Sequence, residues 1–153
     1  MQMFQQLNLP QIEPRLQRDA TGRLQIYDPL RSKYVPLTPE EWVRQHFVAM
    51  LADRLGYPRG LMANEVSIRL NGLSRRCDTV VYDRHARPVM IVEYKAPDIQ
   101  LDRRVFDQIL RYNSVLRASW LVISNGMQHI ACRLEYEPLR PEFVETIPPF
   151  DSL

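Results

Sequence analysis

The sequence predicts an α/β domain in which helices flank a central mixed sheet, in the order α-β-β-β-α-β-β, with a β-hairpin in front. Three observations give this fold class. Two segments carry apolar residues at helical spacing, five short segments have strand character, and the turn signals Asn71-Gly72 and Asn125-Gly126 separate neighbouring strands. At 153 residues the chain has the size of one domain and can bury a core without disulfides.

The first expected elements are the hairpin and the first helix. The hairpin covers residues 24–37, with its turn at 28–31. Thr38-Pro39-Glu40-Glu41 then provides an N-cap, a proline in the first turn and a capping-box glutamate, which together open a helix. Gly56-Tyr57-Pro58 ends that helix. Its apolar stripe comprises Val43, Phe47, Met50 and Leu51.

Three strands of an antiparallel meander follow the first helix. Alternating and apolar runs place them at residues 65–70, 75–83 and 88–95. Tight turns at 71–72 and 84–87 join them. The meander would form one half of the central sheet.

A second helix and two more strands complete the expected core. Apolar residues at helical spacing predict a helix over 101–116 that crosses the sheet. Strands at 119–124 and 127–134 form the last hairpin. From Pro138 onward the chain is rich in proline, and we expect it to be irregular. The predicted parts are therefore a hairpin extension at 1–37, a core at 38–135 and an irregular tail at 136–153.

Composition and charge restrict the class of protein without identifying a function. The hydrophobic share of 45% and charged share of 25% are typical of globular proteins, and a net charge of +2 does not by itself indicate nucleic acid. No apolar run approaches the ~20 residues that cross a bilayer, and residues 1–10 lack the features of a signal peptide. Cys77 and Cys132 form no zinc-binding pattern. We therefore expect a cytoplasmic protein without a membrane partner and with reduced cysteines.

The main chemical signal lies where the third strand of the meander ends. Its apolar run is followed by Glu93 and Lys95, which a strand period of two places on one face. Charges that continue a buried strand are costly unless they have partners. If the preceding turn is a four-residue loop, Asp83 pairs with Pro88, and the same register places Asp78 opposite Glu93. The register therefore predicts two carboxylates that face each other.

Two opposed carboxylates repel each other unless a cation lies between them, and a divalent metal ion is the natural occupant. Oxygen ligands favour a hard ion such as Mg²⁺, for which Mn²⁺ can substitute. Lys95 would lie beside this ion, where it could orient or deprotonate a water or neutralise charge on a phosphate. This set of groups suits phosphodiester hydrolysis. The alternative interpretation is an ion pair of Asp78, Glu93 and Lys95 at the solvent edge of the sheet.

Several motifs resemble a known family. Asp78, followed at a distance by Glu93-Tyr94-Lys95 and a helix, resembles the D…E-x-K signature of PD-(D/E)XK nucleases. More narrowly, residues 38–134 resemble the N-terminal nuclease domain of type I restriction enzyme R subunits. This likeness is carried by Thr38-Pro39-Glu40-Glu41-Trp42-Val43-Arg44-Gln45, Arg76-Cys77-Asp78, Val92-Glu93-Tyr94-Lys95-Ala96-Pro97 and Ser124-Asn125-Gly126. The resemblance implies a restriction-endonuclease-like sandwich.

The resemblance also implies the metal site. Asp78, Glu93 and the Tyr94 carbonyl would bind the metal, and Lys95 would be catalytic. A first-helix glutamate would support the site, and Glu41 is the first choice. Its role as the capping-box partner of the N-cap is an equally good alternative, and neighbouring glutamates could substitute for it. Those glutamates are Glu40 and Glu65.

Two further residues are implied to lie near nucleic acid. Gln108 and Tyr112, one helical turn apart, resemble the Q-x-x-x-Y element that some branches of the superfamily place close to DNA. Tyr112 could equally belong to the hydrophobic core.

The implied activity is that of a magnesium-dependent endodeoxyribonuclease of the restriction-modification type, acting on DNA, with RNA as an alternative substrate. The sequence has no G-x-x-x-x-G-K-[ST], so these 153 residues carry no ATP-driven motor and need no nucleotide cofactor. Such a domain can act alone, as a homodimer or with a partner protein. The competing hypotheses are a catalytically inactive domain that binds nucleic acid or a partner protein, and a domain whose carboxylates hold a stabilising metal.

Overall fold

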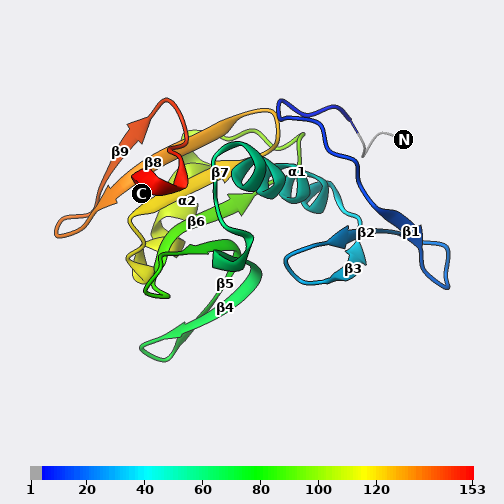
Figure 1. Cartoon of the computed structure of the whole chain (residues 1–153). Coiled ribbons are helices and arrows are strands. Elements are labelled where there is room, and N and C mark those ends of the chain that lie inside the picture. Colours follow the sequence, from blue (N-terminus) through cyan, green and yellow to red (C-terminus); the bar gives the residue numbers. More distant parts are fainter. Residues whose placement is uncertain (1–4) are drawn as a thin grey trace.

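The computed structural model describes residues 5–153, which form two sheets and two α-helices (Figure 1). Residues 1–4, part of the segment in which we expected no signal peptide, lie outside the described residues. Within residues 5–153, no helix has the length and hydropathy that crossing a membrane requires. The helices are α1 (Pro39–Arg54) and α2 (Arg103–Asn113), and the 3₁₀ turns are η2 (Arg59–Leu61), η3 (Ser114–Leu116) and η4 (Phe150–Ser152).

The strands form a small N-terminal sheet and a larger main sheet. The N-terminal sheet contains β1 (Leu16–Arg18), β2 (Leu24–Asp28) and β3 (Lys33–Pro36). The main sheet contains β4 (Met62–Leu70), β5 (Leu73–Tyr82), β6 (Pro88–Tyr94), β7 (Trp120–Ser124), β8 (His129–Glu135) and β9 (Arg140–Val144), in this spatial order. Only β6 and β7, between which α2 crosses over, run parallel. The predicted mixed sheet is confirmed.

The two helices cover opposite faces of the main sheet. On β6, Val92 packs in the core cluster that includes Phe47 of α1. Its neighbour Ile91 packs in the cluster that includes Phe106 of α2. Because successive strand residues point to opposite faces, this alternation builds one core on each side of the sheet. The α/β fold class is thus confirmed.

The first helix begins where the sequence predicts. Thr38 is its N-cap, and the Thr38 hydroxyl accepts the backbone N–H of Glu41 at 3.0 Å. Pro39 occupies the first turn, where its missing N–H costs no helical hydrogen bond. Val43 and Phe47 of the predicted stripe are fully buried, so this face of α1 packs on the sheet.

The segment before β1 is fastened to α1 and to the β7–β8 turn. The backbone N–H of Asn8 donates to the Gly126 carbonyl at 2.8 Å, and the Trp42 indole donates to the Gln5 carbonyl at 3.0 Å. Gly126 has a φ of +84°, and a Cβ there would lie 2.8 Å from a methyl group of the buried Leu7. The turn therefore requires glycine both for its backbone and for its contact with the N-terminal segment.

The turn between β5 and β6 differs from the prediction by one residue. Tyr82 pairs with Pro88, so the predicted pairing of Asp83 with Pro88 is wrong. A β-bulge next to Tyr82 takes up the additional residue. Beyond the bulge, Thr79 pairs with Val92 in the register that the sequence predicted. Two deviations of opposite sense therefore cancel before the strands reach the carboxylates.

The expectation of an irregular tail is wrong. β9 pairs with β8 at the edge of the main sheet, and an edge strand tolerates Pro141 because one side of its backbone needs no sheet partner. Phe150 of η4 is buried in the cluster on the α1 side, and its N–H donates to the Leu55 carbonyl at 3.0 Å.

Strand β1 was also not predicted, since its three residues are all exposed and show no alternation. The division into 1–37, 38–135 and 136–153 stays a prediction.

Candidate active site

One cavity of about 360 Å³ brings most of the predicted site residues together, between the middle of β5, the end of β6 and the side of α2. Six of the residues that line it were singled out from the sequence: Asp78, Glu93, Tyr94, Lys95, Gln108 and Tyr112. The structure adds Arg76 from β5 and Asn113 from the end of α2, which the sequence analysis did not select as site residues. Arg76 belongs to one of the motifs that carry the family resemblance, but no sequence pattern assigns a site role to it or to Asn113.

Asp78 lies at an interruption of backbone pairing. The β4–β5 register pairs Asn64 with Thr79 and Val66 with Cys77, and it passes over the residues between them. One of these is Asp78, whose carboxylate accepts the backbone N–H of Tyr94 at 2.9 Å. The Asp78 side chain therefore accepts a hydrogen bond of the kind that backbone carbonyls accept elsewhere in the sheet.

The Glu93 carboxyl in this cavity has a strongly raised pKa. Burial, and then the nearby charge of Asp78, raise the pKa of the Glu93 carboxyl well above its usual range. The Glu93 Oε1 atom is buried and has no hydrogen-bond partner among the described residues. A buried acceptor without a partner is costly, and a proton or a cation would satisfy it.

Lys95 follows the last residue of β6. Its backbone N–H donates to the Ser124 carbonyl at 2.9 Å, which ties it to β7. The residue is half-buried and lines the cavity with Asp78 and Glu93. Lys95 thus shares a cavity with two carboxyl groups, and Arg76 is a second basic residue in its wall.

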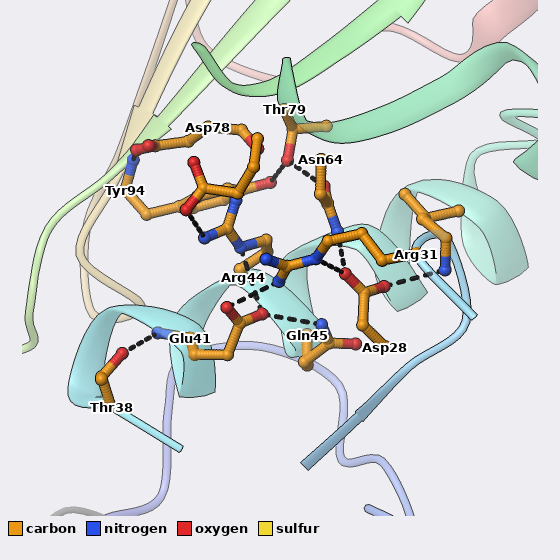
Figure 2. Close-up of polar contacts among 12 residues, drawn as sticks. Asp28, Arg31, Thr38, Glu41, Arg44, Gln45, Asn64, Asp78, Thr79 and Tyr94 are labelled. Atoms are coloured by element: carbon orange, nitrogen blue, oxygen red, sulfur yellow. Dashed lines mark hydrogen bonds and ion pairs between the residues drawn. The ribbon is translucent and has the colours of Figure 1, made fainter. Parts of the chain in front are cut away.

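Glu41 does not line this cavity. It belongs to a buried polar network on the α1 side of the sheet, drawn in Figure 2. Its carboxylate accepts hydrogen bonds from Arg31 at 2.7 Å, Arg44 at 3.1 Å and Gln45 at 2.8 Å. The shortest link of Glu41 to the cavity in the described hydrogen bonds runs through Arg44, which also donates to the Asp78 carbonyl. A supporting role for Glu41 stays a prediction.

The same network reaches the N-terminal sheet. Asp28 at the end of β2 is fully buried and accepts from Asn64 at 3.0 Å and from Arg31. Asn64 in turn accepts from Thr79 at 2.7 Å, and Thr79 shares a 2.8 Å hydrogen bond with the Tyr94 hydroxyl. Burial raises the pKa of Asp28, but its hydrogen bonds from Asn64 and Arg31 outweigh burial and lower it overall. Sequence patterns do not reveal this network, because its members lie on separate segments.

The donor set of the cavity fits a hard divalent ion. Among residues 5–153, no group of three or more His, Cys, Asp or Glu side chains that could hold a metal is found. Mg²⁺, however, is commonly held by one or two carboxylates with waters and substrate phosphate completing its shell. Asp78 and Glu93 supply two carboxyl groups, and the buried Glu93 Oε1 has no hydrogen-bond partner within residues 5–153. These residues are compatible with such an ion.

Comparison with known families matches residues 39–148 to the family described as type I restriction enzyme R protein N terminus (HSDR_N). The matched span runs from α1 to the segment beyond β9 and includes every residue of the cavity. No curated protein matches the chain.

Proposed function

Because the chain belongs to the family of type I restriction enzyme R protein N termini, which has a PD-(D/E)XK nuclease-like fold, we propose that it is a metal-dependent endonuclease acting on DNA. The observation that carries this proposal is the shared cavity of Asp78, Glu93 and Lys95. The family supports DNA as the substrate in general, and RNA is the alternative. The proposed place of action is inside the cell.

Each cavity residue has a distinct proposed task. Asp78, Glu93 and the Tyr94 carbonyl would hold Mg²⁺ or Mn²⁺, which as a Lewis acid would polarise the phosphate and acidify a water. Lys95 would orient that water or neutralise the charge that develops on the phosphate. Its position beside two carboxylates keeps a cation where the phosphate would enter.

Gln108 and Tyr112 of α2 form the opposite wall of the cavity. Tyr112 is 38% exposed, which makes its ring available to a substrate and argues against a core role. A DNA strand that reaches the carboxylates would pass along this wall. We therefore assign the two side chains to substrate contact.

The proposal is tested by incubating the pure protein with supercoiled DNA, with linear DNA and with RNA, in Mg²⁺, in Mn²⁺ and with chelator. The protein should nick DNA only when metal is present. Lys95→Ala should abolish cleavage while leaving folding and Mn²⁺ binding largely intact. The matched control is Lys33→Ala, because Lys33 is the only other lysine and lies exposed on β3.

The outcomes separate the competing functions. Cleavage by Lys95→Ala at the parent rate would assign the activity to another site or to a contaminant. Absence of cleavage by the parent, with DNA retention that weakens as salt rises, would support the non-catalytic binding domain instead, since phosphate contacts release counterions. Stabilisation by metal without either effect would support a purely structural ion.

A further inference from the structure

We propose that Arg44 of α1 is a positioning residue that holds Asp78 and Tyr94 in their metal-binding geometry from the face of the sheet opposite the cavity. The inference rests on the proposed function, because it concerns the same metal site. Arg44 is only 5% exposed and does not line the cavity.

The guanidinium of Arg44 is held by three acceptors from three segments. It donates to the Asp78 backbone carbonyl at 2.5 Å, to Glu41 at 3.1 Å and to Glu65 at 3.2 Å. Figure 2 shows the Arg44 side chain between Glu41 on α1 and the strand that carries Asp78. The two carboxylates balance its charge, so a buried arginine is stable here.

The Asp78 carbonyl needs this donor because the β4–β5 ladder is interrupted beside it. The register passes over Glu65 and Asp78, and Glu65 has a φ of 55°, which is unusual for a residue in a strand. A buried backbone carbonyl left without a donor is costly. Arg44 supplies this donor from α1, and the hydrogen bond thereby fixes the position and orientation of the Asp78 backbone within β5.

Tyr94 is held by the same arrangement. Its backbone N–H donates to the Asp78 carboxylate, so a shift of Asp78 would move the Tyr94 backbone whose carbonyl is the third proposed ligand. The guanidinium carbon of Arg44 also lies 5.7 Å from the centre of the Tyr94 ring. Arg44 is thus linked to both residues without lining the cavity.

A lysine cannot reproduce these contacts. The planar guanidinium directs five donors in fixed directions, whereas an ammonium group is a compact charge on a flexible stem. Arg44→Lys therefore keeps the charge between Glu41 and Glu65 but loses the simultaneous hold on the Asp78 carbonyl. Glu41, on this view, acts on the site through Arg44.

The matched control is Arg31→Lys. Arg31 is the other arginine that donates to Glu41, and its second partner is Asp28 rather than a residue of the cavity. Both variants replace a buried or half-buried arginine in one network by lysine. Only one of them alters the contact with Asp78.

The test measures Mn²⁺ affinity by electron paramagnetic resonance of the free ion, together with amide hydrogen exchange in the metal-free protein. In Arg44→Lys, Mn²⁺ affinity should fall about tenfold or more, as is usual for partners behind a metal ligand. Exchange protection of the Tyr94 amide should fall beyond the change in global stability. Arg31→Lys should lose stability in urea but keep the parent's Mn²⁺ affinity and Tyr94 protection.

Parent affinity in Arg44→Lys, or equal losses of affinity in both variants, would overturn the inference and leave the proposed function intact. Failure of the parent to bind Mn²⁺ would overturn both. If Arg44→Lys does not fold, Glu65→Gln takes its place, because Glu65 is less buried and holds Arg44 on one side only. It should reduce Mn²⁺ affinity in the same direction by a smaller factor, and unchanged affinity would overturn the inference.

Discussion

The carboxylate of Asp78 accepts the backbone N–H of Tyr94 at 2.9 Å, so the side chain of one proposed metal ligand fixes the backbone of another. The described β5–β6 pairing extends from the turn to Thr79 and Val92, and the Asp78 side chain takes over where that ladder ends. Glu93 lies between Val92 and Tyr94, half-buried, and it is close enough to Asp78 for the Asp78 charge to raise its pKa. The two carboxyl groups therefore resist carrying two charges at once, and a proton or a cation would offset that cost.

Asp78→Asn should leave the metal-free protein at least as stable as the parent. The amide oxygen of asparagine can still accept the Tyr94 N–H, and the substitution removes the charge that opposes ionisation of Glu93. Magnesium should stabilise the parent more than the variant. An ion at a hundredfold excess over its Kd stabilises the folded state by about 2.7 kcal/mol, and the variant has lost one of the groups that would bind the ion. Thermal unfolding by circular dichroism, with and without Mg²⁺, measures both effects.

The control for this comparison is Asp98→Asn, which removes an exposed carboxylate from the loop after β6. It should respond to Mg²⁺ as the parent does. A sharp loss of stability in metal-free Asp78→Asn would show that the Asp78 charge is a structural ion-pair partner, and the metal site would lose its main support.

Glu93→Gln should flatten the dependence of stability on pH. Because the folded pKa of Glu93 lies above its unfolded value, the folded protein keeps a proton that the unfolded chain releases. This stabilisation is complete below the unfolded pKa and is lost as pH rises to the raised folded value, by at most about 1.4 kcal/mol per pH unit. Urea unfolding of parent and variant from about pH 5 to pH 8 isolates this contribution as a difference. Parallel curves for the two proteins would contradict it.

The register of β5 and β6 shows best how much of the site can be predicted from the sequence. The carboxylates could be predicted to meet because Glu93 and Lys95 end an apolar strand and a short turn links it to Asp78. The turn itself could not be predicted in detail, because the Asp83 side chain accepts from the Arg87 N–H at 3.0 Å and extends the loop. Turn chemistry and a bulge are local choices that periodicity does not reveal.

Arg44 illustrates the part that sequence patterns could not supply. In the sequence it is one of many arginines, and its spacing of three from Glu41 suggests only a surface ion pair. Its other acceptors come from the separate strands that carry Glu65 and Asp78. A buried contact among distant segments depends on tertiary packing, which the pattern of one helix does not encode.

Gly126→Ala should destabilise the fold more than Gly72→Ala. Both glycines have positive φ, +84° and +77°, so both substitutions carry a backbone cost of about 1–2 kcal/mol. A Cβ at Gly72 meets open space, whereas one at Gly126 would lie 2.8 Å from Leu7 and 3.1 Å from Val43. Overpacking of this kind adds typically about 1–3 kcal/mol. Chemical denaturation of the two variants measures the difference.

Leu7→Ala provides the control, because it removes the methyl groups that the new Cβ would meet. In that background only the 3.1 Å contact with Val43 remains, so the extra cost of Gly126→Ala over Gly72→Ala should shrink. If the extra cost of Gly126→Ala is undiminished without the Leu7 methyl groups, the contact between the N-terminal segment and the β7–β8 turn is not its cause.

The last prediction concerns the arginine that stacks on the cavity wall. The guanidinium carbon of Arg75 lies 4.0 Å from the centre of the Tyr112 ring, and its Nε is buried with no hydrogen-bond partner among the described residues. Stacking uses the face of a guanidinium, so the terminal in-plane N–H groups can still donate to a phosphate. Arg75→Ala should therefore weaken DNA binding in metal-free buffer and reduce the slope of log K against log salt by about 0.9, the value for one lost phosphate contact. Arg117→Ala is the matched control, since Arg117 stacks on Tyr136 at 4.7 Å away from the cavity. Fluorescence anisotropy of labelled duplex DNA over a range of salt concentrations measures both variants, and equal slopes for Arg75→Ala and Arg117→Ala would remove Arg75 from the DNA-binding surface.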